Sequence, residues 1–342
     1  MNQADPGWGE WDVAGDGYPE FNYDLNQNGK VVSYGDAAAD YLVDVMSGLG
    51  NTFVKGIGSQ PFVLELATFA PHAPYTPAPR YLGTFHETVP RIASFNTANV
   101  NPPAWLKSYM KLTPVQVKGL DTDFNLRVEA VQAVDDMITA LMATLKTAGL
   151  DQSTYIFFSS DNGYHMGEHR LTAGKQTAFD SDIKVPLIVI GPGVPAGAVV
   201  DDLVENIDLC PTFAEIGGAT APPTVEGHSL AAFLTTGTVT DWRQAALVEH
   251  RGGTMDAKDP DLEPTGATDP TTYNAIRLAN EVYVEYETGE TEYYDIETDP
   301  YEMDNTVATL PAAKVASYHD TLTAIRNCHD ASSCWAAQKI AP

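Results

Sequence analysis

The stretch that decides the fold is Tyr155-Ile156-Phe157-Phe158-Ser159-Ser160-Asp161-Asn162-Gly163, where an apolar run leads directly into polar residues. The apolar part predicts a buried strand. Residues 126–149, before it, show helical periodicity, and the run Val185-Pro186-Leu187-Ile188-Val189-Ile190, after it, predicts another buried strand. Strands and helices that alternate at this spacing indicate an α/β fold.

The residues on the N-terminal side favour the same fold class. Asn28-Gly29 predicts the turn of a hairpin over residues 22–34, and we expect Asp36 to cap a helix over residues 37–57. The run from Phe62 to Ala67 predicts a further buried strand, because its residues are mostly apolar. A proline-rich loop that contains His72 follows it.

Beyond about residue 236 the pattern changes to short strands. The runs 246–249, 272–276, 282–286 and 292–296 predict four strands, and residues 311–326 predict a final helix. A turn over residues 287–290 joins the last two strands. We therefore expect two domains: residues 1–235 form a sheet flanked by helices, and residues 236–342 form a small antiparallel sheet with a helix.

The composition is that of a globular protein with a strongly acidic balance. The chain has 342 residues, of which 44% are hydrophobic, and 46 Asp and Glu against 19 Lys and Arg give a formal net charge of −27. This charge repels phosphate backbones and anionic lipids, so nucleic-acid and membrane-surface binding are disfavoured. Residues 1–8 lack the basic and apolar regions of a signal peptide. The apolar stretch Val185–Val200 is interrupted by Gly and Pro, which argues against membrane insertion.

The three cysteines suggest different roles. Cys328 and Cys334 lie six positions apart in a polar segment near the C-terminus, where they either form a small disulfide loop or remain as two free thiols. Cys210 is expected to be a buried small apolar residue.

Asp161 and Asn162 are the strongest candidates for a ligand site, because they follow a buried strand directly. In open α/β sheets, ligands bind outside the carboxyl ends of the strands. Carboxylate and amide oxygens are the ligands that Ca²⁺ and Mg²⁺ prefer. The alternative is that Asp-Asn-Gly is only a turn. Two residues also cannot fill the roughly six to eight positions around Ca²⁺, so a metal site needs further ligands.

His72 and Lys175 could contribute to the same site. His72 also follows a predicted strand, so we expect its loop at the same edge of the sheet, where an imidazole can bind an anion or transfer a proton. Lys175 follows the Asp-Asn-Gly loop closely and could act as a point charge or proton donor toward an anionic leaving group. Each residue alone could equally be an ordinary surface residue.

Several runs together resemble the type I sulfatases, and within them the N-acetylglucosamine-6-sulfatase and endosulfatase branch. The resemblance covers essentially the whole chain. The matching segments are residues 70–74, 160–171, 174–175, 182–186, 191–193 and 294–305.

The resemblance implies an alkaline-phosphatase-like α/β domain, a smaller C-terminal domain and the hydrolysis of sulfate esters on sulfated saccharides with Ca²⁺, or less typically Mg²⁺, at the site. By position, Asp161 and Asn162 match metal ligands of the family, and Lys175 matches its active-site lysine. His72 lies in the histidine loop of the family and His165 matches a substrate contact. Many sulfatases carry a second histidine where this chain has Tyr75, which leaves open which histidine contacts the sulfate.

The larger departure from the family is an absent segment. Sulfatases carry a Cys- or Ser-x-Pro-Ser-Arg run whose first residue becomes the formylglycine nucleophile, and this run is absent from the 342 residues. We therefore expect residues 1–235 to be the C-terminal part of a sulfatase catalytic domain, with the formylglycine in a missing N-terminal segment, and the chain alone to be inactive.

The resemblance also bears on location and on competing functions. Many relatives are exported, so the complete protein is expected to be secreted or periplasmic, and a Cys328–Cys334 bridge suits that location. One alternative function is a non-catalytic relic that binds sulfated glycans, and another is a phosphoesterase of the same superfold. The sequence does not indicate an oligomeric state.

Overall fold

The computed structural model of the protein describes residues 7–252 and 270–340. These residues pack as two units. The first contains the described residues of Met1–Val89 together with Val117–Thr154, and the second contains those of Pro90–Gln116 and Tyr155–Pro342. This division does not test the domain boundary near residue 236, which stays a prediction. The expectation about residues 1–8 falls almost entirely outside the described residues.

The first unit combines a small sheet with two long helices. Its elements are β1 (Asp12–Ala14), β2 (Asp24–Gln27), β3 (Lys30–Ser33), the 3-10 turn η1 (Ala38–Asp40), α1 (Leu42–Ile57) and most of α3 (Pro114–Ala148).

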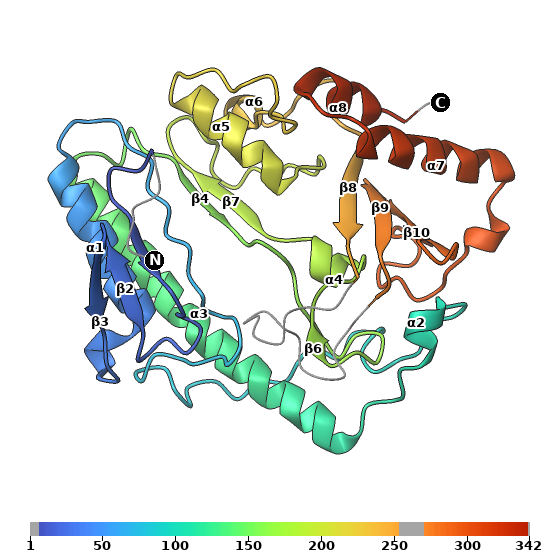
Figure 1. Ribbon diagram of the computed structural model, residues 1–342, viewed down its shortest axis with the longest axis horizontal. Helices are drawn as coiled ribbons and strands as arrows, with labels where there is room; N and C mark the ends of the chain where they lie inside the picture. The colour runs from blue at the N-terminus through green and yellow to red at the C-terminus, as the bar shows by residue number, and fades with distance from the viewer. Residues whose placement is uncertain (1–6, 253–269, 341–342) are drawn as a thin grey trace. The chain divides into compact units, whose positions relative to one another are not determined.

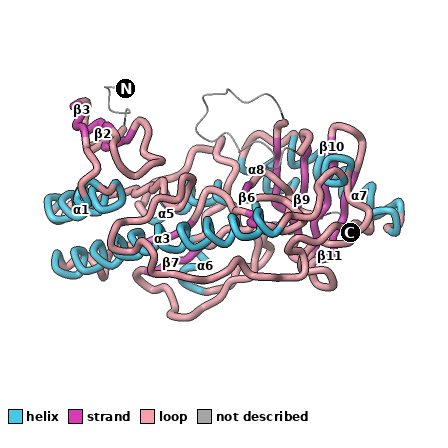
Figure 2. The backbone as a smooth tube through the Cα atoms, turned by 90° about the horizontal axis from the view of Figure 1, so that it is seen from below, coloured by secondary structure: helices cyan, strands magenta, loops and turns pink. Residues whose placement is uncertain are grey.

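The predicted hairpin is confirmed as β2 and β3. The two strands pair antiparallel with Gln27 opposite Lys30. Asn28 and Gly29 both have positive φ, 52° and 90°, which is the backbone that a two-residue turn requires and that Asn-Gly supplies. Buried Tyr23 and Leu25 pack with Leu42 of α1, so the hairpin and the helix share one small core. Figure 2 shows the backbone of β2 and β3 beside α1.

The two helices of this unit begin at different residues from those predicted. Asp36 does not cap the first one: Asp40 accepts hydrogen bonds from the backbone of Gly35 and Ala37, which forms η1 and delays α1 to Leu42. The helix predicted over 126–149 begins at Pro114, because its first turns are held by polar contacts rather than by an apolar stripe. Asn125, for example, bonds both backbone groups of Glu87.

The strand predicted over residues 62–67 is wrong. None of the described strands pairs with this segment, so its backbone groups form no ladder hydrogen bonds. A strand exists only with a partner that satisfies its backbone groups.

The described residues of the second unit form three sheets and several helices. Its elements are α2 (Ala104–Lys107), β4 (Ile156–Ser159), β5 (His165–Met166), β6 (Ala173–Gly174), α4 (Asp180–Ile183), β7 (Leu187–Ile190), η2 (Asn206–Asp208), α5 (Leu209–Ile216), α6 (Ala231–Thr236), β8 (Ala245–His250), β9 (Tyr273–Leu278), β10 (Glu281–Tyr286), β11 (Thr291–Asp295), η3 (Val307–Thr309), α7 (Ala312–Arg326) and α8 (Ala331–Ala337).

The C-terminal antiparallel sheet is confirmed. Its strands follow the order β11-β10-β9-β8, and all neighbours are antiparallel. The helix α7 lies against this sheet (Figure 1), with Tyr318, Leu322 and Ile325 in one core with Ile276 and Tyr283. The mixed α/β architecture with a small C-terminal sheet and helix confirms the predicted fold class.

The two strands predicted around the polar loop also form. They are β4 and β7, and they pair antiparallel from Ile156 opposite Ile190 to Ser159 opposite Leu187. Phe157 contacts Phe213 of α5 edge to face at 4.9 Å, so α5 packs on this sheet (Figure 1). The pair therefore positions the segment that begins at Ser160.

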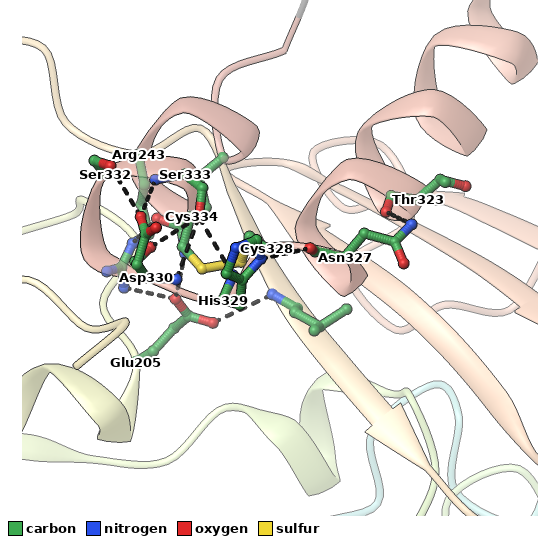
Figure 3. The surroundings of a disulfide bond; sticks show 12 residues. Glu205, Arg243, Thr323, Asn327, Cys328, His329, Asp330, Ser332, Ser333 and Cys334 are labelled. Atoms are coloured by element: carbon green, nitrogen blue, oxygen red, sulfur yellow. Dashed lines mark hydrogen bonds and ion pairs between the residues drawn. A yellow bond between two sulfur atoms is a disulfide. The ribbon is translucent and has the colours of Figure 1, made fainter. Parts of the chain in front are cut away.

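The cysteines are arranged around two helices. Cys328 and Cys334 form a disulfide that joins the end of α7 to α8 (Figure 3). Cys210 is free and exposed on α5, so the prediction of a buried cysteine is wrong, since this helix turns Pro211 and Thr212 inward instead. In the part of the chain that the structure describes, each helix is too short or too polar to cross a lipid bilayer.

A buried ionic network joins η2 to the C-terminal segment. Arg243 donates to both carboxylate oxygens of Asp208 at 2.5 and 2.6 Å, and it also pairs with Glu205 at 2.9 Å. Gln338 closes the network by accepting from Arg243 and donating to Glu205, each at 3.2 Å. The side chains of Arg243 and Asp208 are 0% exposed, so neither charge has access to bulk water.

Replacing Arg243 by Leu is expected to reduce the free energy of unfolding by about 3–5 kcal/mol, because it leaves buried carboxylates without a counter-charge. Arg251→Leu is the matched control, since the Arg251–Glu249 pair is 57% and 38% exposed and such pairs contribute about 0–1 kcal/mol. Denaturant unfolding measures both values, and equal losses would contradict this account of the network.

Glu292, on β11, is a buried acidic residue that lacks a basic partner among the described residues. Burial raises the pKa of its carboxyl to about 8, and the nearby Glu290 adds to the shift. The folded chain therefore binds more protons at this site than the unfolded chain between about pH 5 and pH 8. In that range the free energy of unfolding falls as the pH rises.

Glu292→Gln should therefore be as stable as the wild type near pH 5 and more stable above pH 8, because glutamine has no charge to bury. The difference should grow by on the order of 1 kcal/mol per pH unit between these limits. Thermal and denaturant unfolding from pH 5 to pH 9 measure it. The exposed Glu297→Gln variant should follow the wild type at every pH, and a Glu292→Gln gain that does not depend on pH would refute this assignment.

Candidate functional site

The polar loop after β4 and the β5–β6 hairpin bring two predicted site residues together. β5 and β6 pair antiparallel, with His165 opposite Gly174, so the chain returns to the loop directly before Lys175. The Lys175 Nζ atom lies 3.4 Å from Oδ1 of Asn162. The predicted cation and one predicted metal ligand thus meet, although 13 residues separate them in the sequence.

The loop itself is held by short-range hydrogen bonds. Oδ1 of Asp161 accepts from the backbone N–H of Asn162 at 2.9 Å, and the Ser160 hydroxyl donates to the Asn162 carbonyl at 2.8 Å. The side-chain Nδ2 of Asn162 donates to the Gly163 carbonyl at 2.8 Å, so the Oδ1 of the same side chain is oriented toward Lys175. The Asp161 side chain is exposed.

Gly163 allows this loop to approach α4 closely. Its N–H donates to the Asp182 carbonyl at 2.7 Å, and the next N–H, of Tyr164, donates to the Ser181 carbonyl at 2.8 Å. A Cβ atom at residue 163 would lie 2.1 Å from the Ser181 carbonyl oxygen, which no side chain can accept. Only glycine fits here, so the Asp-Asn-Gly run is more than a generic turn.

Asp182 is the residue that joins the parts of the site. Its buried carboxylate accepts from Nδ1 of His165 at 2.9 Å and from the backbone N–H and hydroxyl of Thr177 at 2.9 and 2.7 Å. Thr177 lies two residues after Lys175, and the Asp182 carbonyl holds Gly163, next to Asn162. The side chain and the backbone of Asp182 therefore fix the segments that carry all four residues predicted for this site in the second unit, Asp161, Asn162, His165 and Lys175.

His165 is fully enclosed in this arrangement. Its side chain is 0% exposed, and its Nδ1–H donates to Asp182. The structure thus shows how the ring is oriented. Its role as a substrate contact remains a prediction.

His169 is a second buried histidine, which the sequence interpretation did not select. Its ring stacks on Phe179 with centroids 3.8 Å apart. Burial lowers its pKa to about 3, and the nearby His165 contributes to the shift, so the ring is neutral at pH 7. The side-chain Nδ2 of Asn99 donates to the Glu302 carbonyl, so the Oδ1 of Asn99 faces Nδ1 of His169 at 2.7 Å. Because this Oδ1 can only accept, the proton of the neutral His169 ring is on Nδ1.

The backbone at this histidine is strained. His169 and Arg170 have φ values of 56° and 68°, in the left-handed region that residues other than glycine rarely adopt. Such strain persists only where surrounding contacts determine the conformation, and it is concentrated at functional sites.

His72 lies in the first unit, so the structure does not test whether it shares a site with Lys175. Within its own unit its Nδ1 lies 3.0 Å from the Ala73 carbonyl, and its ring contacts Tyr18 edge to face at 4.7 Å. Arg127 donates to the Pro71 carbonyl at 3.1 Å and supports the loop. Tyr75, where many sulfatases have a second histidine, has a left-handed backbone with φ of 61°.

Asp161 and Asn162 offer the type of ligand that a hard divalent cation prefers, but they are too few to complete its coordination sphere. Asp161 and Asn162 offer one carboxylate and one amide oxygen, which suit Ca²⁺. In residues 7–252 and 270–340, no three His, Cys, Asp or Glu side chains come close enough to hold a metal ion. A complete coordination sphere therefore requires oxygens beyond this pair.

The sequence interpretation missed Asp182, Thr177 and Asn206 as parts of the site. Asp182 could have been suspected, because an acidic residue between Phe179 and the apolar strand β7 needs a buried partner. Thr177 and Asn206 have no comparable signal, since their roles depend on how the chain folds back. Asn206 donates from Nδ2 to the backbone carbonyls of Ser160 and Asp161 at 3.2 and 3.4 Å.

Comparison with known proteins agrees with the resemblance seen in the sequence. The sulfatase family model matches residues 12–219, and the model for the C-terminal part of N-sulphoglucosamine sulphohydrolase matches residues 167–327. The N-acetylglucosamine-6-sulfatase of Bos taurus is 32% identical over 94% of this chain and 62% of its own length. The extracellular sulfatase SULF-1 homolog of Drosophila melanogaster is 32% identical over 72% of this chain and 23% of its own length.

Solved structures show the same fold. A protein in complex with its substrate D-glucosamine-2-N,6-O-disulfate superposes with a TM-score of 0.78 at 21% identity, covering 93% of this chain and 75% of that one. The phosphonate monoester hydrolase of Silicibacter pomeroyi superposes with a TM-score of 0.67 at 22% identity, covering 85% and 61%. These likenesses place the fold among the alkaline-phosphatase-like sulfatase folds. The chain spans somewhat less than two thirds of the length of the N-acetylglucosamine-6-sulfatase it matches, and by its family match it belongs to the sulfatase family.

Proposed function

We propose that this chain provides the sulfate-binding and metal-binding side of a sulfatase that hydrolyses sulfate esters on sugars. The observation that carries the proposal is the contact between Lys175 and Asn162, with Nζ 3.4 Å from Oδ1. A cationic donor beside oxygen ligands for a divalent metal is the pairing that an anionic sulfate group requires. The net charge of −27 makes such a local positive site necessary, because the rest of the chain repels sulfate.

The chemistry assigns a role to each residue. Hydrolysis breaks the bond between sulfur and the sugar oxygen, and that oxygen leaves with a negative charge until it takes up a proton. Lys175 donates hydrogen bonds to the sulfate or to the leaving oxygen. Asp161 and Asn162 would hold Ca²⁺, which when bound supplies positive charge near the sulfate oxygens. His72 is assigned to the same anion by family resemblance alone.

The substrate class and location follow from the relatives. Enzymes named for N-acetylglucosamine-6-sulfate and extracellular sulfatases match most of this chain. We therefore propose a sulfated amino sugar as substrate and a secreted location for the complete protein. The Cys328–Cys334 disulfide supports an oxidising compartment.

Sulfate binding is expected to depend on both the cation and the lysine. Glucosamine-6-sulfate, titrated into the chain by calorimetry in the presence of Ca²⁺, should bind about tenfold or more weakly to Lys175→Ala, because a charge-assisted hydrogen bond is lost. Chelation of Ca²⁺ by EGTA should weaken binding to the wild type as well.

Lys184→Ala is the control, because Lys184 is exposed and lies in the same unit. It should bind as the wild type does. Equal affinities of Lys175→Ala and the wild type, or binding unaffected by EGTA, would contradict the assignment of the site.

Turnover requires a nucleophile, and the 342 residues contain no Cys- or Ser-x-Pro-Ser-Arg run that could yield formylglycine. We therefore propose that the chain alone binds sulfate esters but hydrolyses them slowly or not at all. The assay uses 4-nitrocatechol sulfate with Ca²⁺, after treatment with formylglycine-generating enzyme. Rates comparable to a complete sulfatase would refute this proposal.

A second candidate is a non-catalytic protein that binds sulfated glycans, for which the contact between Lys175 and Asn162 would suffice. Binding of sulfated oligosaccharides with no turnover, even when the missing segment of a related sulfatase is supplied, would support it. Turnover that appears upon that addition would support the enzyme instead.

A further inference from the structure

Asn206 makes a contact with the candidate metal-ligand loop that the reaction chemistry alone does not explain. It is the first residue of η2, and its Nδ2 donates to the carbonyls of Ser160 and Asp161 at 3.2 and 3.4 Å. More than forty residues separate Asn206 from Ser160 and Asp161 in the sequence, so this is a long-range tertiary contact rather than part of a local turn.

The position of these carbonyls explains why they need a donor. The ladder between β4 and β7 ends at the pair of Ser159 and Leu187, so the next backbone groups leave the sheet. Backbone carbonyls away from the ladder bond to water or to other donors, and the Ser160 carbonyl also accepts from the Ser159 hydroxyl at 3.4 Å. Asn206 supplies one at the point where the chain turns toward the Asp161 and Asn162 side chains, and it thereby fixes the direction in which the loop departs.

Asn206 is itself held rigidly from both sides. Glu205 precedes it and Asp208 follows two residues later, and both carboxylates bind the buried Arg243. The Glu205 N–H donates to Asp208 at 2.8 Å, which closes the turn around Asn206. Figure 3 shows Glu205 and Arg243 beside the disulfide. Gln338, which follows α8, donates to Glu205 at 3.2 Å.

We propose that Asn206 is a positioning residue for the Asp161–Asn162 pair, and that the Arg243 network holds it in place. The inference builds on the proposed function, because it assigns to Asn206 the orientation of the residues that bind the metal and the sulfate ester. The Asn206 side chain is exposed and outside the core, so its replacement should disturb the loop without unfolding the chain.

The test compares four variants of the full chain. Asn206→Asp keeps the shape and removes the donor, Asn206→Ala removes the side chain, and Asn206→Gln keeps a donor on a longer side chain. Ile207→Ser is the matched control, because the neighbouring Ile207 is 49% exposed. Hydrogen exchange of the amides of residues 160–164 reports loop order, and calorimetric titration with glucosamine-6-sulfate and Ca²⁺ reports ligand affinity.

We expect Asn206→Asp and Asn206→Ala to speed exchange in this loop about fivefold to tenfold and to weaken binding by a similar factor, at an unchanged melting temperature. Asn206→Gln should restore part of both. Exchange that equals the wild type in the Asp and Ala variants would overturn the inference. So would an equal increase in Ile207→Ser, or an increase that extends through β8–β11, since either indicates a general structural effect.

The two measurements separate this inference from the function it builds on. If the wild type binds no glucosamine-6-sulfate, the proposed function fails. The exchange rates of the Asn206 variants still decide whether Asn206 orders the loop.

Discussion

The buried carboxylate of Asp182 is the interaction on which the rest of the site depends. It accepts hydrogen bonds from His165 and from both donors of Thr177, and the backbone of the same residue anchors Gly163. A buried carboxylate is costly unless its oxygens are fully bonded, and here the donors His165 and Thr177 come from two separate segments. Meeting that requirement is what brings the loop after β4 and the segment after β6 together.

The site contrasts with the electrostatics of the whole chain. The chain has 46 Asp and Glu against 19 Lys and Arg, yet Lys175 faces an amide oxygen of Asn162 in the loop after β4. At physiological salt, charges beyond roughly 8–10 Å are largely screened, so a single ammonium group and a divalent cation can set the local sign. The acidic composition then disfavours the binding of polyanions, while the proposed binding of a small sulfated sugar needs only the local charge at Lys175 and the Asp161–Asn162 loop.

Much of this arrangement could be predicted from the sequence, and there are physical reasons why the rest could not. Asn28-Gly29 and the alternating strands of the C-terminal sheet are encoded locally, so their predictions are confirmed. The run from Phe62 to Ala67 has the composition of a strand, but strand formation requires a partner that composition does not reveal. The short sequence distance between Lys175 and the Asp-Asn-Gly loop, together with the family resemblance, predicted that they share a site. The role of Asn206 arises only when segments more than forty residues apart meet.

The residues of the Arg243 network are synthesised at different times during translation. Its residues are synthesised far apart: Gln338 lies 95 positions after Arg243, and a ribosome adds about 5–20 residues per second. For roughly 5–20 s during translation, Asp208 and Arg243 therefore exist without the residue that completes their enclosure. Gln338, which directly follows α8 of the disulfide-linked helix pair, is therefore the last residue of this network to be synthesised.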